Sequence, residues 1–80
     1  MRHFVNVGTN SFIAIDEIET ISPPESAPIK RMVNLAKDEN RCIECTYGRR
    51  VKSVVVLKTG KIVLSATLPQ TLVERIAAKN

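Results

Sequence analysis

Four consecutive apolar residues, Val54–Leu57, constrain the fold of this chain more than any other feature. Side chains alternate between the two faces of a β-strand, so a strand with this sequence has to be covered on both sides. Because a chain of 80 residues has little material for a core, we expect its two helices to cover only one face of a small sheet. The other face would then be covered by a second subunit, or alternatively by the N-terminal strands folding over it.

One segment has the clear periodicity of an amphipathic helix. It begins at Glu25 or Ala27 and ends at Glu39. Its apolar stripe consists of Ile29, Met32, Val33 and Ala36. Ser22 stands three residues before Glu25, which is the spacing of a capping box, and Ser26 is a second candidate N-cap.

Extended segments and a second helix account for most of the remaining chain. Strand patterns occur at residues 3–7, 12–15, 18–21, 42–46, 51–58 and 61–66. Thr59-Gly60 makes a tight turn between the last two strands. The second helix spans residues 69–79, with Thr67 and Gln70 as its candidate capping box. These elements predict an α+β fold, a small mainly antiparallel sheet with two helices, in a single domain over residues 1–80.

The cysteines are better explained by structure than by chemistry. Cys42 and Cys45 have C-x-x-C spacing, but the chain contains no further cysteine and only one histidine, His3. A structural zinc site needs four ligands. Residues three apart in a strand point to opposite faces, so the two thiols are not expected to converge, and Ile43 and Cys45 should share the buried side. We therefore expect structural cysteines in a reducing compartment and no metal.

Neither catalysis nor membrane insertion is indicated. The chain has no Ser-His-Asp set and no glycine-rich loop that could cradle a phosphate. Asp16, Glu17 and Glu19 alternate with isoleucines and are expected to form a solvated face. The longest apolar run is far below the roughly 20 residues of a membrane span, and the first eight residues lack a signal-peptide core. We therefore expect a cytoplasmic protein that is not an enzyme, with no cofactor, membrane partner or small-molecule substrate.

Positive charge is concentrated in the second part of the chain. Residues 1–29 contain one basic and four acidic residues, whereas residues 30–80 contain eleven basic and four acidic residues. The two parts thus carry net charges of −3 and +7, which together give the +4 of the whole chain. Such an asymmetry suggests a polyanionic partner, either nucleic acid or an anionic membrane surface.

The candidate binding residues follow a glycine. Arg49 and Arg50 come directly after Gly48, in a loop where both guanidinium groups can grip phosphate oxygens bidentately. Lys52 can assist them, and Lys58 and Lys61, which flank the next turn, could extend the positive surface. With only three aromatic residues, the chain lacks a stacking platform for single strands, and it shows no helix-turn-helix pattern.

Two stretches resemble a known family. Residues 24–31 (Pro-Glu-Ser-Ala-Pro-Ile-Lys-Arg) and residues 46–50 (Thr-Tyr-Gly-Arg-Arg) resemble the signature stretches of the RemA family, small bacterial regulators that activate biofilm-matrix genes. Leu64-Ser65-Ala66 and Pro69 also resemble that family. The resemblance covers nearly the whole chain without a sizeable gap.

This resemblance implies a DNA-binding transcription regulator with a LytTR-like domain that assembles into an octamer-type ring. DNA would wrap around the ring through the paired arginines, at Arg49 and Arg50 here. A further basic position of the family falls near Asp16 and Glu17, where this chain is acidic, and Lys52 keeps the charge of a family arginine.

Three functional hypotheses follow. The first is a ring-forming regulator that binds double-stranded DNA with little sequence preference, with Arg49 and Arg50 on phosphates and Lys52 assisting. The second is a structural or protein-interaction ring whose arginines pair with acidic groups of a neighbouring subunit, such as Glu44. The third, a protein that binds anionic membranes, is disfavoured because neither helix has a strongly basic face.

Overall fold

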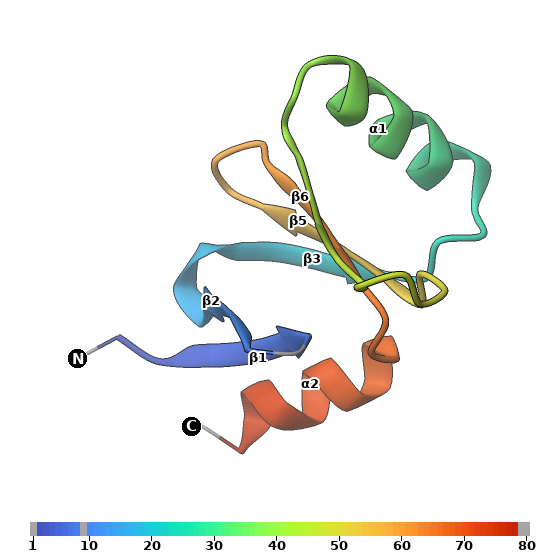
Figure 1. Ribbon diagram of the computed structural model, residues 1–80. Helices are drawn as coiled ribbons and strands as arrows, with labels where there is room; N and C mark the ends of the chain where they lie inside the picture. The colour runs from blue at the N-terminus through green and yellow to red at the C-terminus, as the bar shows by residue number, and fades with distance from the viewer. Residues whose placement is uncertain (1, 9, 79–80) are drawn as a thin grey trace.

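The chain folds into helices and strands in nearly the predicted order (Figure 1). The computed structural model describes residues 2–8 and 10–78. The elements are β1 (Phe4–Gly8), β2 (Ser11–Ala14), the short 3-10 helix η1 (Ile15–Glu17), β3 (Ile18–Ser22), α1 (Ala27–Asp38), β4 (Cys42–Cys45), β5 (Ser53–Leu57), β6 (Ile62–Ser65) and α2 (Pro69–Ala77). Thr9, which lies between the first two predicted strands, and Lys79 at the predicted end of the second helix are outside the described residues. None of the helices in the described part of the chain is both long enough and apolar enough to span a bilayer.

The α+β prediction is confirmed, but the strands form two sheets rather than the one small sheet predicted. Strands β1 and β2 form an antiparallel pair, and a four-stranded sheet has the order β3-β5-β6-β4. In the larger sheet β5 pairs antiparallel with β3 and β6, but β4 runs parallel to β6. The larger sheet is therefore mixed, with one parallel pairing, but the other strand pairings are antiparallel, as predicted for a mainly antiparallel sheet. The seven residues between β4 and β5 make this possible, because they cross the end of β6 and so span two strand spacings of about 4.8 Å each.

The turn at Gly60 confirms the predicted hairpin between β5 and β6. The Gly60 N–H donates to the Leu57 carbonyl over 3.0 Å, and the Leu57 N–H donates to the Lys61 carbonyl over 2.9 Å. Gly60 has φ of 93°, a left-handed conformation that glycine adopts without a steric penalty. This is a three-residue hairpin loop closed by a glycine bulge.

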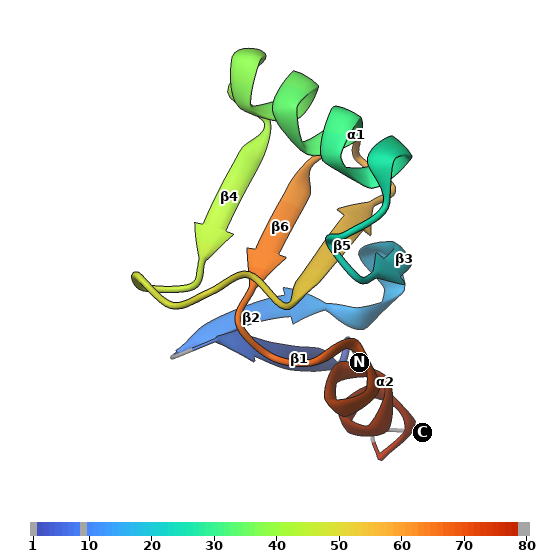
Figure 2. The same cartoon turned by 90° about the vertical axis from the view of Figure 1, so that its right-hand side faces the viewer.

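The two faces of the four-stranded sheet are covered by different parts of the same chain. Val54 and Val56 pack with Ala36 of α1 on one face. Val55 and Leu57 pack on the other face with a cluster that includes Val5, Val7, Val63, and Leu72 of α2. Figure 2 shows α1 on one side of the sheet and the β1–β2 hairpin with α2 on the other.

This arrangement corrects the expectation that both helices share one face. The helices lie on opposite faces, and the N-terminal hairpin folds over the sheet beside α2. Val54–Leu57 is consequently buried within one chain. The two-sided strand therefore gives no argument for a second subunit, and any self-association has to be argued from the surface.

Helix α1 begins at the second of its two candidate caps. The Ser26 Oγ accepts a hydrogen bond from the Ile29 N–H over 3.3 Å, and a proline stands in the first turn. Ser22 instead ends β3, opposite Val54 of β5. The capping-box prediction at Ser22 is wrong because strand pairing holds that residue in the sheet, while Ser26 is the residue before the first helical turn.

Replacing Ser26 with alanine is expected to lower the free energy of unfolding by about 1 kcal/mol, because one N-terminal amide of α1 loses its acceptor. Ser22→Ala is the matched control, and we expect it to change stability by less than about 0.5 kcal/mol. Urea unfolding followed by circular dichroism measures both values. Equal losses in the two variants would contradict the assignment of the cap.

Helix α2 lacks the predicted capping box. Its N-cap residue is Leu68, which has no side-chain cap, and Pro69 follows at the start of the helix. Thr67 does not cap the helix. Its backbone N–H donates to the Ser65 Oγ over 3.1 Å, and its carbonyl accepts from the Ser53 Oγ. The helix is held instead by Leu72, which is fully buried in the core.

Candidate nucleic-acid interface

The predicted binding residues lie on the segment Thr46–Lys52, which we call the arginine loop. It connects the end of β4 to the start of β5 and passes the end of β6, so it caps one end of the four-stranded sheet (Figure 2). Thr46 is buried, whereas the tip from Tyr47 to Lys52 is exposed except for Val51. The strand predicted at 51–58 starts only at Ser53, so Val51 and Lys52 belong to this loop.

A tight turn of type I′ forms the tip of the arginine loop. The Arg49 N–H donates to the Thr46 carbonyl over 3.0 Å, and the two central residues have positive φ, 51° at Tyr47 and 83° at Gly48. This turn type requires positive φ at both central positions, which costs a non-glycine residue such as Tyr47 about 1–2 kcal/mol. The Tyr47 hydroxyl lies 3.2 Å from the Ser11 Oγ. The tip therefore has a defined shape, and it holds both arginines outside the sheet.

Buried hydroxyl groups tie the base of the arginine loop to neighbouring segments. Ser53 and Ser65 are directly opposite each other on β5 and β6 and are fully buried. The Ser65 Oγ donates to the carbonyl of Val7 in β1, and the Ser53 Oγ donates to the carbonyl of Thr67. The Lys52 N–H donates to the Ser65 carbonyl over 2.8 Å. Because buried polar groups are costly to leave unpaired, these bonds fix β1 and the chain before α2 beside the loop.

Within the described residues, the charged side chains of the arginine loop form no ion pair. Arg49, Arg50 and Lys52 are exposed, and the ion pairs found among residues 2–8 and 10–78 do not involve them. Arg49 lines a polar depression of about 230 Å³ together with Arg75 of α2. The structure thus adds a third arginine, 26 positions after Arg49 in the chain, to the surroundings of the predicted site.

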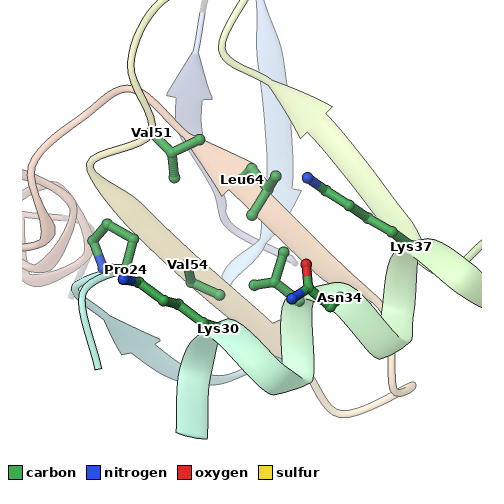
Figure 3. Close-up of a pocket in the computed structure, with 8 residues that line it drawn as sticks. Pro24, Lys30, Asn34, Lys37, Val51, Val54 and Leu64 are labelled. Carbon is green, nitrogen blue, oxygen red and sulfur yellow. The ribbon is translucent and has the colours of Figure 1, made fainter. Parts of the chain in front are cut away.

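A groove on the other side of the arginine loop carries further positive charge. It lies between α1 and the sheet, with a volume of about 250 Å³. Figure 3 shows Lys30, Asn34 and Lys37 along the helix side of this groove, opposite Val51, Val54 and Leu64. Val51 therefore turns toward the α1 face, whereas Arg49 of the same loop reaches the opposite face.

Lys58 and Lys61 do not join the arginine loop. They flank the β5–β6 turn, at the opposite end of the sheet from Ser53 and Ser65. The five residues of β5 separate the two ends, and at about 3.3 Å per residue the two groups are roughly 16 Å apart. The predicted positive residues therefore form two separate groups.

The acidic residues at the position where the resemblance implies a basic residue also lie away from the arginine loop. Asp16 and Glu17 are in η1, and the Glu17 carbonyl accepts from the Lys58 N–H, at the end of the sheet that holds the β5–β6 turn. Both carboxylates pair with Arg2, at 3.4 Å and 2.8 Å. The hydrogen bond with Glu17, together with the charge of Asp16, raises the pKa of Arg2. These carboxylates are therefore engaged locally and do not neutralise Arg49 or Arg50.

The two cysteines lie on opposite faces of β4, as predicted. Cys42 packs with the α1 cluster, and Cys45 is buried in the cluster on the other face. Partial burial raises the pKa of the Cys42 thiol, which disfavours the reactive thiolate. Ile43 shares the face of Cys45 but is exposed rather than buried, because β4 is an edge strand. Among the described residues, no group of three or more potential ligands is arranged to hold a metal.

Sequence reasoning missed two parts of this surface. Arg75 lies on the short helix α2, and no local sequence pattern relates it to Arg49. The pair Ser53 and Ser65 had a weak signal, since each serine stands at the end of an otherwise apolar strand. A polar residue at such a position indicates that a buried hydrogen-bond partner is supplied from elsewhere in the chain.

Comparison with known proteins identifies close relatives. A family model described as RemA-like, extracellular matrix regulatory protein A-like, matches residues 4–76. The chain is 43% identical over 75 residues to extracellular matrix regulatory protein A of Bacillus subtilis, covering 94% of this chain and 84% of that protein. It is 47% identical over 73 residues to a protein of Coprothermobacter proteolyticus that is provisionally named as regulatory, covering 91% and 70% of the two chains. The region matched by the family model contains the whole arginine loop and Arg75.

Proposed function

Because the chain belongs to the RemA-like family of regulatory proteins, we propose that it is a transcription regulator that binds double-stranded DNA. The observation that carries the proposal is the exposed pair Arg49 and Arg50 on a tightly shaped loop, without an acidic partner in the described chain. Lys52 assists them. Arginine is well suited to this role, since its planar group binds phosphate bidentately and stays charged at all physiological pH values.

The contacts are proposed to be with phosphates rather than with base edges. Neither the tip of the arginine loop nor the short helix α2 beside it can enter the major groove as a recognition helix does. Phosphate contacts carry little sequence information by themselves, so preference would arise from the ease with which a given duplex bends. Binding is consequently expected to be sequence-tolerant and strongly dependent on salt.

We propose a ring of subunits because one subunit supplies too few contacts, and the octameric type is what the family resemblance implies. Each phosphate neutralised contributes a salt slope of only about −0.9, so two or three contacts bind weakly. A ring repeats the same loop and presents each later contact at high effective concentration. Such repeated contacts could offset the cost of bending a duplex of 20–30 base pairs, which is on the order of 1–6 kcal/mol.

Exposed apolar side chains support self-association. Phe12 is 60% exposed and Ile43 is 42% exposed, and both line a groove of about 450 Å³ beside the edge strand β4. On the far side of the sheet, Leu35 of α1 is 54% exposed. Two different apolar surfaces on one subunit allow the head-to-tail contacts from which rings are built. A LytTR-like fold, a cytoplasmic location and activation of extracellular-matrix genes are parts of the same proposal.

One observation supports a second candidate function, an interaction ring. Glu44 is exposed on the edge strand β4, two residues before the start of the arginine loop, and its Oε2 accepts from the Thr46 Oγ1 over 2.8 Å. In a ring, the arginines of one subunit could pair with Glu44 of the next. The protein would then be an interaction ring in which Arg49 and Arg50 hold the assembly together rather than bind DNA.

Sizing the purified protein with and without a repetitive DNA duplex, across a salt series, tests the proposal. We expect an assembly larger than a monomer in the absence of DNA, and a shift to a protein–DNA complex at low salt that weakens steeply as salt rises. A folded monomer that does not bind duplex DNA at low salt would contradict both the proposed ring and the proposed DNA binding. An assembly that ignores DNA would favour the interaction ring.

A further inference from the structure

The depression lined by Arg49 and Arg75 differs in chemistry from the grooves described above. It lies where β1, the arginine loop and the segment before α2 meet. Its lining includes the polar residues Asn6, Thr46 and Thr67 besides the two arginines, and none of the described residues that line it is acidic. Its volume of about 230 Å³ is several times the roughly 30 Å³ that one water occupies in the liquid. It is therefore an open, polar and positively charged site.

Arg75 is held in place at this depression. One of its terminal nitrogens donates to the backbone carbonyl of Asn6 in β1 over 2.7 Å. A guanidinium group has five N–H donors, so this bond leaves most of them for a ligand. It also restricts the side chain before any ligand arrives, which lowers the entropy lost on binding. The ion pairs formed within the described part of the chain do not involve Arg75.

The walls of the depression are closely packed. Gly8 at the end of β1 lies so close to β4 that a Cβ atom on it would stand 2.5 Å from the Cys45 carbonyl oxygen. The Ser65 Oγ bond to the Val7 carbonyl joins the same strand to β6. Because backbone and buried groups make these contacts, the positions of β1 and the base of the arginine loop are fixed relative to each other.

We propose that this depression seats one phosphate group of the DNA backbone between Arg49 and Arg75. The inference rests on the proposed function and extends its site from the arginine loop to α2. Two guanidinium groups from separate segments can approach one phosphate from two directions and satisfy more of its oxygens than one arginine can. The duplex would then follow the surface from the arginine loop toward α2, rather than toward the β5–β6 turn.

The test compares three variants for binding to a fluorescent, repetitive duplex by anisotropy across a salt series. We expect Arg75→Gln to weaken binding by about five- to tenfold at low salt and to reduce the salt slope by about 0.9 for each phosphate that is no longer neutralised. Arg75→Lys keeps the charge but not the planar fork, so it should keep the slope and recover part of the affinity. Arg31→Gln is the charge-matched control, since Arg31 is exposed on α1 across the sheet, and its effect should be less than about twofold.

The outcomes separate this inference from the proposed function. If Arg75→Gln binds DNA as the unmodified protein does, while replacement of Arg49 and Arg50 abolishes binding, the site at Arg75 is overturned and the proposed function stands. If neither change affects DNA binding, both are overturned. A loss in Arg31→Gln as large as that in Arg75→Gln would also overturn the site, because net charge alone would explain it.

Two further measurements cover folding and the source of the phosphate. Should Arg75→Gln fail to fold by circular dichroism, the decision passes to Arg75→Lys, and full affinity in that variant would overturn the inference. A titration with inorganic phosphate at constant ionic strength, followed through the side-chain Nε–H signals of the arginines, tests the alternative source. We expect no saturable binding, and saturation at Arg75 without any effect of Arg75→Gln on the duplex would overturn the assignment to DNA.

Discussion

Replacing Arg49 and Arg50 together with alanine is expected to reduce the affinity for duplex DNA by about a hundredfold or more at roughly 150 mM salt, with fold and assembly unchanged. The change removes two exposed cations from every subunit, and a ring multiplies this effect by the number of its subunits. Since neither residue is buried or ion-paired in the described chain, stability should change by less than about 0.5 kcal/mol. Anisotropy measures the affinity, and analytical ultracentrifugation measures the assembly.

The double variant Lys58→Ala and Lys61→Ala is the matched control. It removes the same charge from the opposite end of the sheet, beside the β5–β6 turn, and we expect it to weaken DNA binding by less than about tenfold, through long-range attraction alone. An equal loss in the two double variants would show that net charge, not the arginine loop, determines binding. Disassembly of the arginine double variant, with negligible DNA binding by the unmodified protein, would support the interaction ring instead.

Replacing Leu72 with alanine is expected to lower the free energy of unfolding by about 2–5 kcal/mol. Leu72 is fully buried and is the residue by which α2 enters the core cluster of β1 and the four-stranded sheet. Domains of this size have a total stability of roughly 0.05–0.15 kcal/mol per residue, so the loss is a large part of the whole. Each kcal/mol of destabilisation lowers the Tm of a domain of this size by about 4–8 °C.

Val73→Ala is the control for this prediction. Val73 is the next residue of the same helix, but its side chain is 54% exposed, and we expect a change of less than about 0.5 kcal/mol. Urea unfolding at several protein concentrations measures both variants, because association makes apparent stability depend on concentration. If Leu72→Ala cost no more than Val73→Ala, α2 would not be packed on the sheet as described, and Arg75 would lose its place beside Arg49.

Local signals were sufficient to predict the elements. A period of two or of 3.6 residues extends over only a few neighbours, and turn residues such as Gly60 act within four positions. For this reason the order of strands and helices, the exposed Tyr47–Arg50 tip and the divergence of Cys42 from Cys45 could be predicted without a structure. Residues 24–31 and 46–50 likewise indicated the family, which the match to the family model confirms.

The choice between equivalent local signals needed the tertiary structure. Ser22 and Ser26 both satisfy the pattern of a helix cap, and only the pairing of Ser22 with Val54 in the sheet excludes the first. The direction of β4 is a similar case. β4 pairs parallel with β6 because the arginine loop crosses the end of β6 before β5 begins. The sequence of β4 itself does not indicate this path.

The run Val54–Leu57 was enough to require burial on both sides of a strand, because an apolar residue is apolar whichever face it occupies. Which segments provide that cover was settled by tertiary packing, which places the hairpin and α2 on one side and α1 on the other. The same packing brings Arg75 beside Arg49. Both results depend on contacts between residues dozens of positions apart. Such contacts form because folding buries apolar surface from all parts of the chain at once. A short stretch of sequence therefore cannot predict them.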